Sequence, residues 1–145
     1  MTCKNKFQKS CLRAYNDDVQ TVTTSPYTVT VIGIKCVDTG ISIGSSPDGK
    51  TVMLCRSGLY HVSLDLDLDV TTAGTITVQI YIDGIAAPCA ASTITGAAAA
   101  TIGTHVETEL CVGPICPGNA RRITFVLSGA EGTVTHTSVG VVKIA

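Results

Sequence analysis

The chain has 145 residues and a mass of 15.0 kDa, enough for one domain that buries about 70% of the surface of its unfolded form. Charged residues make up 14% and hydrophobic residues 45%, with a mean hydropathy of +0.38, which excludes disorder and a coiled coil as the main state. The formal net charge of −1 leaves no surplus of basic side chains to neutralise phosphates, so we expect no nucleic-acid partner.

The first 25 residues differ in character from the rest of the chain. Lys4, Lys6, Lys9 and Arg13 are four of the ten basic residues, and no hydrophobic period persists around them. The segment lacks the apolar core of a secretory signal, and no apolar run in the chain is long enough to span a membrane. We therefore expect a basic arm over residues 1–25 and a folded domain over residues 26–145, with neither export nor membrane insertion.

From Tyr27 onward, runs rich in β-branched residues alternate with turn signals. YTVTVIGIKC and TGISI come first, then SSPDGK, whose Pro-Asp-Gly predicts a tight turn, and then TVMLC. The next run, LYHVSLDLDLDV, alternates strictly, so one face is apolar and the other carries His61, Ser63, Asp65, Asp67 and Asp69. This pattern predicts a long strand with one buried face.

The remaining chain continues in the same manner. TITVQIYIDG predicts a second strand that ends in an Asp83-Gly84 hairpin turn, and IAAPCAASTITG follows it. The alanines at 97–100 are too tightly bracketed by glycines for a stable helix. TIGTHVETELCV predicts a strand with His105, Glu107 and Glu109 on its polar face, and after the loop GPICPGN come RRITFVLSG and TVTHTSVGVVKIA. About eight to ten short strands and no strong helix indicate an all-β sandwich or jelly roll.

Two features bear on assembly and on redox state. Apolar residues occur on both faces of Thr30 to Ile34 and Val139 to Ile144, which favours burial of some of them between subunits. The seven cysteines show neither CxxC nor Cys/His metal spacing, so we interpret most of them as reduced cysteines that serve as small buried apolar residues. Only Cys111 and Cys116, in CVGPIC, are close enough across a turn for a local disulfide.

Taken in order, TGISI, SGLYHVSLDLDL, TITVQIYIDGIAAP and the closing TSVGVVKIA resemble the jelly-roll superfamily of tumour necrosis factor (TNF) and the complement globular heads. The motifs that carry the resemblance are Gly58-Leu59-Tyr60 and Tyr81-Ile82-Asp83-Gly84, and the match spans residues 30–145. It is closer to the bacterial and phage branch, which includes the C-terminal domains of spore-surface glycoproteins and phage head-fibre or capsid-decoration proteins. There is no Gly-X-Y collagen stretch, which disfavours the spore-surface members.

The resemblance implies a TNF-like jelly roll of two antiparallel sheets that assembles as a homotrimer. It suggests a structural virion protein, a capsid-decoration or head-fibre protein assembled in the host cytoplasm and displayed on the virion surface. The alternative is a receptor- or glycan-binding adhesion head for phage attachment or on a spore surface, with cell-surface glycans as partners. No catalytic motif is present, so we do not expect an enzyme, and we expect no cofactor.

Two groups of residues are candidate sites. The arm is expected to anchor the protein to a capsid or another virion protein, through Lys4, Lys6, Phe7, Lys9, Leu12, Arg13 and Tyr15. The alternative is that the arm folds back as an extra strand on its own or a neighbouring subunit. Family likeness would place an acidic stripe near the three-fold axis, made of Asp65, Asp67, Asp69, Glu107 and Glu109.

Carboxylates that alternate along one strand are about 6–7 Å apart, too far to share one ion within a chain. A structural cation at the trimer axis, or simple solvation of the stripe, are the alternatives left open. His61, His105 and His136 all fall on predicted strands, where we interpret them as packed or solvated residues rather than ligands.

Overall fold

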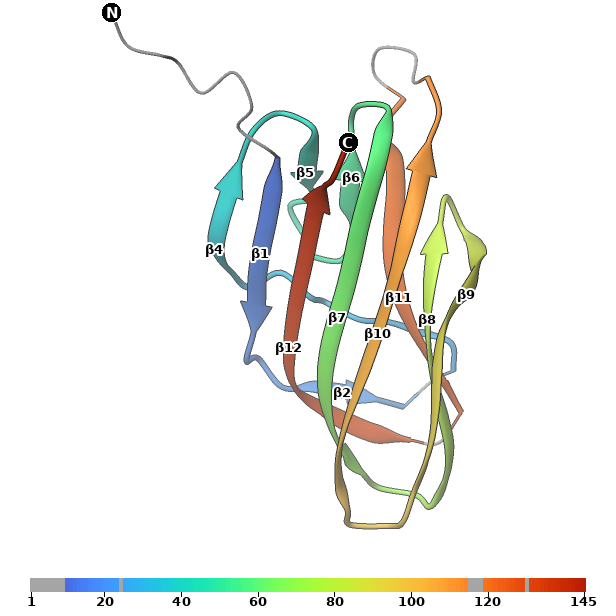
Figure 1. Cartoon of the computed structure of the whole chain (residues 1–145). Helices are drawn as coiled ribbons and strands as arrows, with labels where there is room; N and C mark the ends of the chain where they lie inside the picture. Colours follow the sequence, from blue (N-terminus) through green and yellow to red (C-terminus); the bar gives the residue numbers. More distant parts are fainter. Residues whose placement is uncertain (1–9, 24, 115–118, 130) are drawn as a thin grey trace, which may run out of the picture.

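The computed structural model describes residues 10–23, 25–114, 119–129 and 131–145, and these fold as two stacked antiparallel sheets without a helix (Figure 1). The front sheet has the strand order β10-β7-β12-β1-β4, and β2 pairs with β12 beside this path. Its strands are β1 (Cys11–Asn16), β2 (Gln20–Val22), β4 (Ile34–Thr39), β7 (Gly58–Val70), β10 (Thr101–Val112) and β12 (Gly132–Lys143).

The back sheet has the order β5-β6-β11-β8-β9, and β3 pairs with β11. Its strands are β3 (Tyr27–Thr28), β5 (Ile43–Ser45), β6 (Val52–Leu54), β8 (Gly74–Ile82), β9 (Ile85–Gly96) and β11 (Arg121–Gly129). The chain thus passes repeatedly between the sheets, as in a jelly roll, and the prediction of an all-β jelly-roll sandwich is confirmed.

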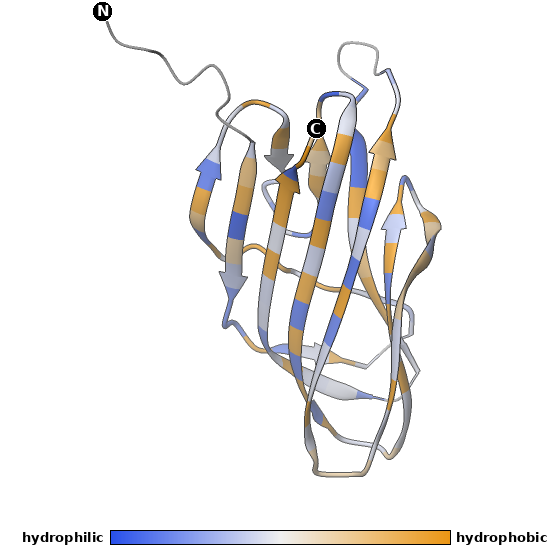
Figure 2. Ribbon diagram, viewed as in Figure 1, coloured by the Kyte–Doolittle hydropathy of each residue, from blue (hydrophilic) through white to orange (hydrophobic). Residues whose placement is uncertain are grey.

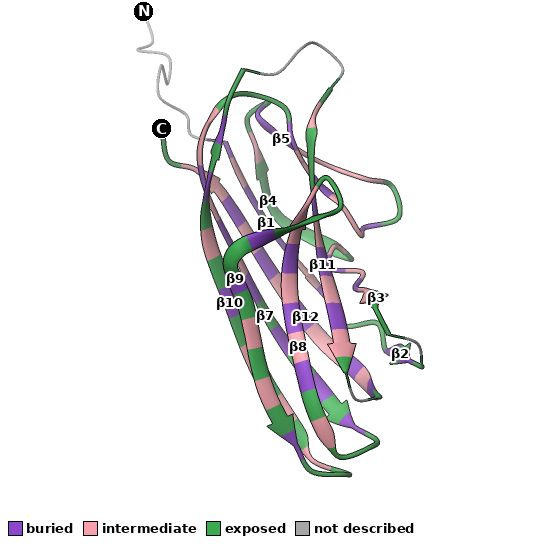
Figure 3. Ribbon diagram, turned by 90° about the vertical axis from the view of Figure 1, so that its right-hand side faces the viewer, coloured by how far each residue is buried: buried purple, intermediate pink, exposed green. Residues whose placement is uncertain are grey.

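The core lies between the sheets and follows from the two-residue alternation of the strands. On β7, Leu64, Leu66 and Leu68 are each 1% exposed while Asp65 and Asp67 between them are exposed. Figure 2 shows this alternation as orange and blue bands along the front strands, and Figure 3 shows buried and exposed residues alternating in the same way. Each fully buried leucine stabilises the fold by about 1.5–3 kcal/mol, so the alternation fixes which face of each strand points inward.

The predicted turns form as their sequences require. The Asp83-Gly84 hairpin joins β8 to β9, and both residues have positive φ, 51° and 79°, as a tight two-residue turn demands. At SSPDGK, the Ser46 amide donates to the Thr51 carbonyl and the Gly49 amide donates to the Ser46 carbonyl. The alanine run at 97–100 makes a turn between β9 and β10, not a helix.

The run YTVTVIGIKC is not one strand, which corrects the prediction. It begins as β3 in the back sheet, crosses between the sheets over residues 29–33, and continues as β4 at the edge of the front sheet. Val29 and Val31 are fully buried in the crossing, so both belong to the core of this chain and not to a subunit interface.

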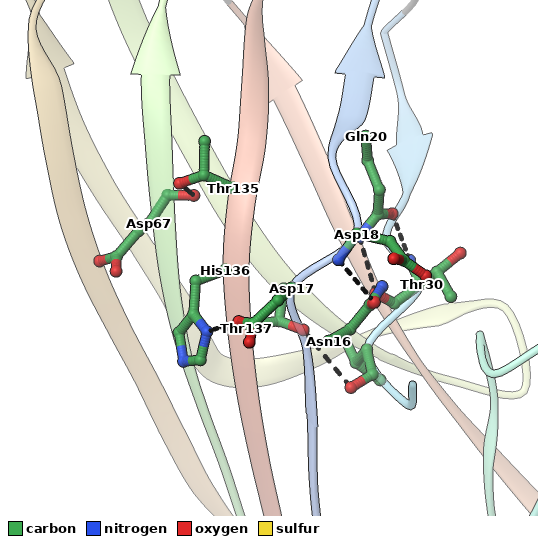
Figure 4. A network of polar contacts seen from close by, with 10 residues as sticks. Asn16, Asp17, Asp18, Gln20, Thr30, Asp67, Thr135, His136 and Thr137 are labelled. Atoms are coloured by element: carbon green, nitrogen blue, oxygen red, sulfur yellow. Dashed lines mark hydrogen bonds and ion pairs between the residues drawn. The ribbon is translucent and has the colours of Figure 1, made fainter. Parts of the chain in front are cut away.

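Buried polar side chains hold this crossing in place (Figure 4). The Gln20 amide nitrogen donates to the Thr30 carbonyl at 2.8 Å, and the Thr30 backbone amide donates to the Gln20 side-chain oxygen at 2.7 Å. Asn16 donates to the same carbonyl at 2.8 Å. Because Asn16 and Gln20 are 4% and 8% exposed, their amides replace water for a backbone segment that lies outside any strand.

The expected boundary between arm and domain at residue 25 is wrong for the described part of the arm. β1 lies inside the front sheet, between β12 and β4, and β2 pairs with β12. Leu12 is 1% exposed and Ala14 is 2% exposed. Residues 10–22 therefore fold back as strands of the same subunit, because their alternation, although short, matches the pleat.

Most of the apolar residues that the sequence places on both faces of two segments are buried inside this subunit. Val139 and Val141 face the core, at 2% and 0% exposed. What stays exposed near the β4 edge and the C-terminus is Ile34, Val37, Ile41 and Ile144. The case for burial between subunits thus rests on these residues and on the outer face of the front sheet.

Candidate functional site

The outer face of the front sheet gathers charged side chains from two adjacent strands. In the β7–β10 ladder, Asp65 is opposite His105, Asp69 is opposite Thr101, and Asp67 is opposite Gly103. Glu107 and Glu109 lie opposite Ser63 and His61. All five members of the acidic stripe, Asp65, Asp67, Asp69, Glu107 and Glu109, are therefore on one surface, and all are exposed.

Histidines interleave with these carboxylates and connect them into a chain. His105 Nδ1 lies 2.7 Å from Asp65 Oδ1, and His105 Nε2 lies 3.3 Å from Glu107 Oε2. His61 Nε2 lies 3.4 Å from the same Glu107 oxygen. The contacts thus run from His61 on β7 to Glu107 on β10, along β10 to His105, and back to Asp65 on β7. We call these four residues the histidine–carboxylate chain.

The hydrogen bond to Asp65, and then that to Glu107, raise the pKa of His105 above its ordinary value of 6.5. Both contacts favour the imidazolium, because a proton on each ring nitrogen can then be donated to a carboxylate oxygen. Partial burial opposes the effect only weakly, since 47% of the side chain is exposed. The stripe therefore carries some of its own counter-charge at neutral pH.

The other stripe carboxylates are less compensated. Asp69 accepts a hydrogen bond of 2.7 Å from the Thr101 hydroxyl. Among the described residues, no ion pair involves Asp67 or Glu109. Excess negative charge therefore remains on this face, and some of it has no partner within the described chain.

A third histidine extends the polar face along β12. His136 Nδ1 contacts Asp17 Oδ1, and this pair joins the β1–β2 connection to the irregular pairing of β12 with β7 (Figure 4). The sequence interpretation of the three histidines as merely packed or solvated missed these partners. Strand parity already placed His61 and Asp65 on one face. Their contacts with residues of β10, and the contact of His136 with Asp17 after β1, depend on the order of the strands in the sheet, which alternation alone does not give.

A shallow trough lies beside the acidic stripe, between β7 and β1. Its volume is about 280 Å³, and its lining includes Ser63, Ser138 and Gly140 as a floor of small residues. Arg13, Tyr15 and Cys36 form one wall and Asp65 lies on the other. The trough was not predicted, because it arises from cross-strand neighbours on four strands, β1, β4, β7 and β12, which are not consecutive in sequence.

The predicted anchoring residues separate into three groups. Lys4, Lys6, Phe7 and Lys9 lie outside the described residues. Leu12 is buried between the sheets, so it cannot insert into a partner without opening the fold. Arg13 is exposed and Tyr15 is half-buried, and both line the trough, where they belong to the sheet face and not to an extended arm.

The histidine, cysteine and acidic side chains of the described residues are the possible metal ligands. Within the described ranges, no group of three or more His, Cys, Asp or Glu side chains is arranged to hold a metal ion. The described cysteines are free thiols, and four of the five are exposed, so the interpretation of most cysteines as buried is wrong for the described ones: Cys11 is half-buried, and Cys36, Cys55, Cys89 and Cys111 are exposed. Cys116 lies outside the described residues, as therefore does the disulfide considered for Cys111. In the part of the chain that the structure describes, no helix is long and apolar enough to cross a membrane.

Comparison with known proteins identifies the fold class. No family model matches the sequence, and no curated protein matches it either. A crystal structure of murine APRIL superposes with a TM-score of 0.71 at 13% identity, covering 94% of this chain and 100% of that one. The globular domain of zebrafish complement 1qA protein covers 95% of this chain and 98% of its own, with a TM-score of 0.60 at 8% identity.

A viral structure is among the similar ones. The PRD1 vertex protein P5 has a TM-score of 0.62 at 13% identity, over 94% of this chain and 97% of that chain. At such identities the likeness establishes architecture alone. The protein is a TNF-like jelly roll, in agreement with the resemblance inferred from its sequence motifs.

Proposed function

We propose that this chain is a structural virion protein, a homotrimeric jelly-roll head that decorates a bacteriophage capsid or forms a head fibre. The observation that carries the proposal is the full-length likeness to the PRD1 vertex protein P5, which covers nearly all of both chains. The absence of any recognisable catalytic motif from the sequence fits a structural and non-enzymatic role at the virion surface.

The proposed homotrimer has support from the front sheet. Its outer face is highly charged along β7 and β10 but carries a trough of small residues beside them. Ile34 and Val37, on the exposed edge strand β4, are 56% and 37% exposed. An exposed apolar edge beside a hollow is typical of a surface that another subunit covers, and the charged side chains would then lie at its rim.

Attachment to the particle is proposed to use the N-terminal end of the chain. Ser10 and the C-terminal residues lie at one end of the sandwich, where the Lys143 amide donates to the Ser10 carbonyl (Figure 1). Lys4, Lys6, Phe7 and Lys9 precede this point in the sequence. Anchoring there leaves the turns at residues 71–73 and 97–100, at the opposite end, facing away from the capsid.

Two measurements test the proposal. Light scattering of the purified chain should give three times its 15.0 kDa mass, and a monomer at micromolar concentration contradicts the trimer. Antibodies against the chain should label virus particles by immunogold electron microscopy in cultures that carry its coding sequence. Unlabelled particles, together with specific retention on a glycan array, would instead support the adhesion head.

A further inference from the structure

Arg13 is an exposed basic side chain beside the trough on the outer face of the front sheet. It is exposed, lines one wall of the trough, and has no ion pair with any described residue. The acidic stripe lies on the opposite side of the trough. Among the described residues, one side of the trough is therefore acidic and the other side carries an arginine without an ion pair.

The sheet register places Arg13 and Glu107 at the same height along the strands. Arg13 is opposite Gly140, Gly140 is opposite Ser63, and Ser63 is opposite Glu107. Three strand spacings separate the two charged residues, about 14 Å between backbones. This is too far for an ion pair within one subunit, and between them lie only a glycine and a serine.

We infer that Arg13 of one subunit pairs with Glu107 of the next, so that the β10 edge of each copy docks over the trough of its neighbour. This inference rests on the proposed trimer and names the contact that holds it. If the three-fold axis is parallel to the strands, rotation keeps every residue at its own height and brings Glu107 of one copy to the level of Arg13 of the next. An acidic patch and a basic patch at opposite ends of one row give a head-to-tail contact, which closes as a ring of three when successive copies are related by a rotation of 120°.

The trough supplies the space that this contact needs. Gly140 has no side chain, and a Cβ built there would meet only the Ser63 hydroxyl, at 3.2 Å. The absence of a side chain at Gly140 therefore leaves the trough open beside Arg13. Asp65 lines the trough and would repel an incoming carboxylate, but its hydrogen bond with His105 offsets that charge.

Guanidinium and carboxylate form short, charge-assisted hydrogen bonds with a planar fit, which lysine cannot reproduce. At a contact shielded by a neighbouring subunit, such a pair sets orientation and partner choice, and reversal of one charge leaves two like charges facing each other. Reversal of both charges restores the attraction.

The experiment is a charge-reversal cycle read by sedimentation equilibrium. Arg13→Glu and Glu107→Arg should each raise the dissociation constant of the trimer at least tenfold, and the double variant should recover most of that loss. Arg122→Glu is the matched control, because Arg122 is exposed on the back sheet and should leave assembly unchanged. Circular dichroism confirms that every variant keeps its β-structure.

A second variant tests the trough without changing charge. Gly140→Leu fills the floor and should weaken association, while the Ser63 hydroxyl can rotate to accommodate the new side chain. A wild-type trimer that Arg13→Glu and Gly140→Leu leave as tight as before would overturn the inferred contact alone. A wild-type monomer would overturn both the trimer and the contact.

Discussion

His105 and Asp65, paired across the β7–β10 ladder with Nδ1 and Oδ1 2.7 Å apart, form the shortest contact of the histidine–carboxylate chain. Each residue occupies the outward position of its strand, so the contact follows directly from register. It joins the edge strand β10 to the central strand β7 by side chains as well as backbone.

The first prediction is that stability falls as pH rises through the folded-state pKa of His105. That pKa is raised, so the stabilisation is complete below the unfolded value of 6.5 and is lost above the folded value. Because the side chain is about half exposed, the effect is at most about 1 kcal/mol, or about 2–4 °C in Tm. Thermal melts from pH 6 to pH 8.5 measure it.

His105→Gln should remove this pH step, since glutamine does not titrate. His61→Gln is the matched control, because it leaves the His105–Asp65 pair intact and should keep the step that belongs to His105. A His105→Gln variant with the full wild-type pH dependence would show that the step belongs to other groups.

The second prediction concerns β1, which was expected to be part of an arm. Leu12→Ala should destabilise the fold by about 2–5 kcal/mol, the cost of an internal cavity at a side chain that is 1% exposed. Urea unfolding measures the loss. Arg13→Ala, the exposed neighbour, should change the free energy of unfolding of the subunit by about 0.5 kcal/mol or less.

Deletion of residues 2–20 also tests whether the fold depends on β1. It removes the whole of β1 and exposes the edges of β12 and β4, so we expect aggregation or an unfolded chain. A soluble, folded product would mean that the front sheet is stable without β1.

The third prediction concerns the crossing between the sheets. Gln20→Leu removes the acceptor of the Thr30 amide and one of the two donors to the Thr30 carbonyl, to which Asn16 still donates. We expect a loss of about 1–3 kcal/mol in urea unfolding. Gln20→Glu retains an acceptor for the amide but loses the donor to the carbonyl, so it should lie between Gln20→Leu and wild type, unless the crossing is held by Val29 and Val31 alone.

Alternation made most of the fold predictable. β10 and β11 have the bounds that the sequence pattern gave, and β7 begins at Gly58 and ends at Val70, because each buries one face only. β1 was missed because six residues with Arg13 and Asn16 among them carry a weak alternating signal. The break in YTVTVIGIKC was missed because Val29 and Val31 alternate as in a strand, although their backbone pairs elsewhere.

Parity predicted that Asp65, Asp67 and Asp69 share one strand face and that Glu107 and Glu109 share another, whereas the resemblance implied that these two strands are neighbours. The histidine partners of the acidic stripe and the trough were not predictable, because both require the lateral order β10-β7-β12-β1. Arg13 shows the difference clearly: in sequence it is one of several basic residues near the N-terminus, and in the sheet it is three strands away from Glu107 at the same height.

The last prediction concerns the charge of the stripe. Asp67 has no ion pair within the described residues and lies among four other carboxylates, so Asp67→Asn should raise Tm at low ionic strength by relieving repulsion. The gain should shrink as salt approaches 1 M, where the screening length is only about 3 Å. Asp18→Asn, an exposed carboxylate outside the stripe, should show no such gain.

Treatment with a chelator shows whether the carboxylates of the acidic stripe repel one another or bind a cation. If three copies bring their carboxylates to a common axis and hold a cation there, EDTA should lower the Tm of the wild-type trimer, and added Ca²⁺ should restore it. If EDTA has no effect while Asp67→Asn still raises Tm at low salt, the stripe repels without a bound cation, and the histidine–carboxylate chain is its principal counter-charge within the subunit.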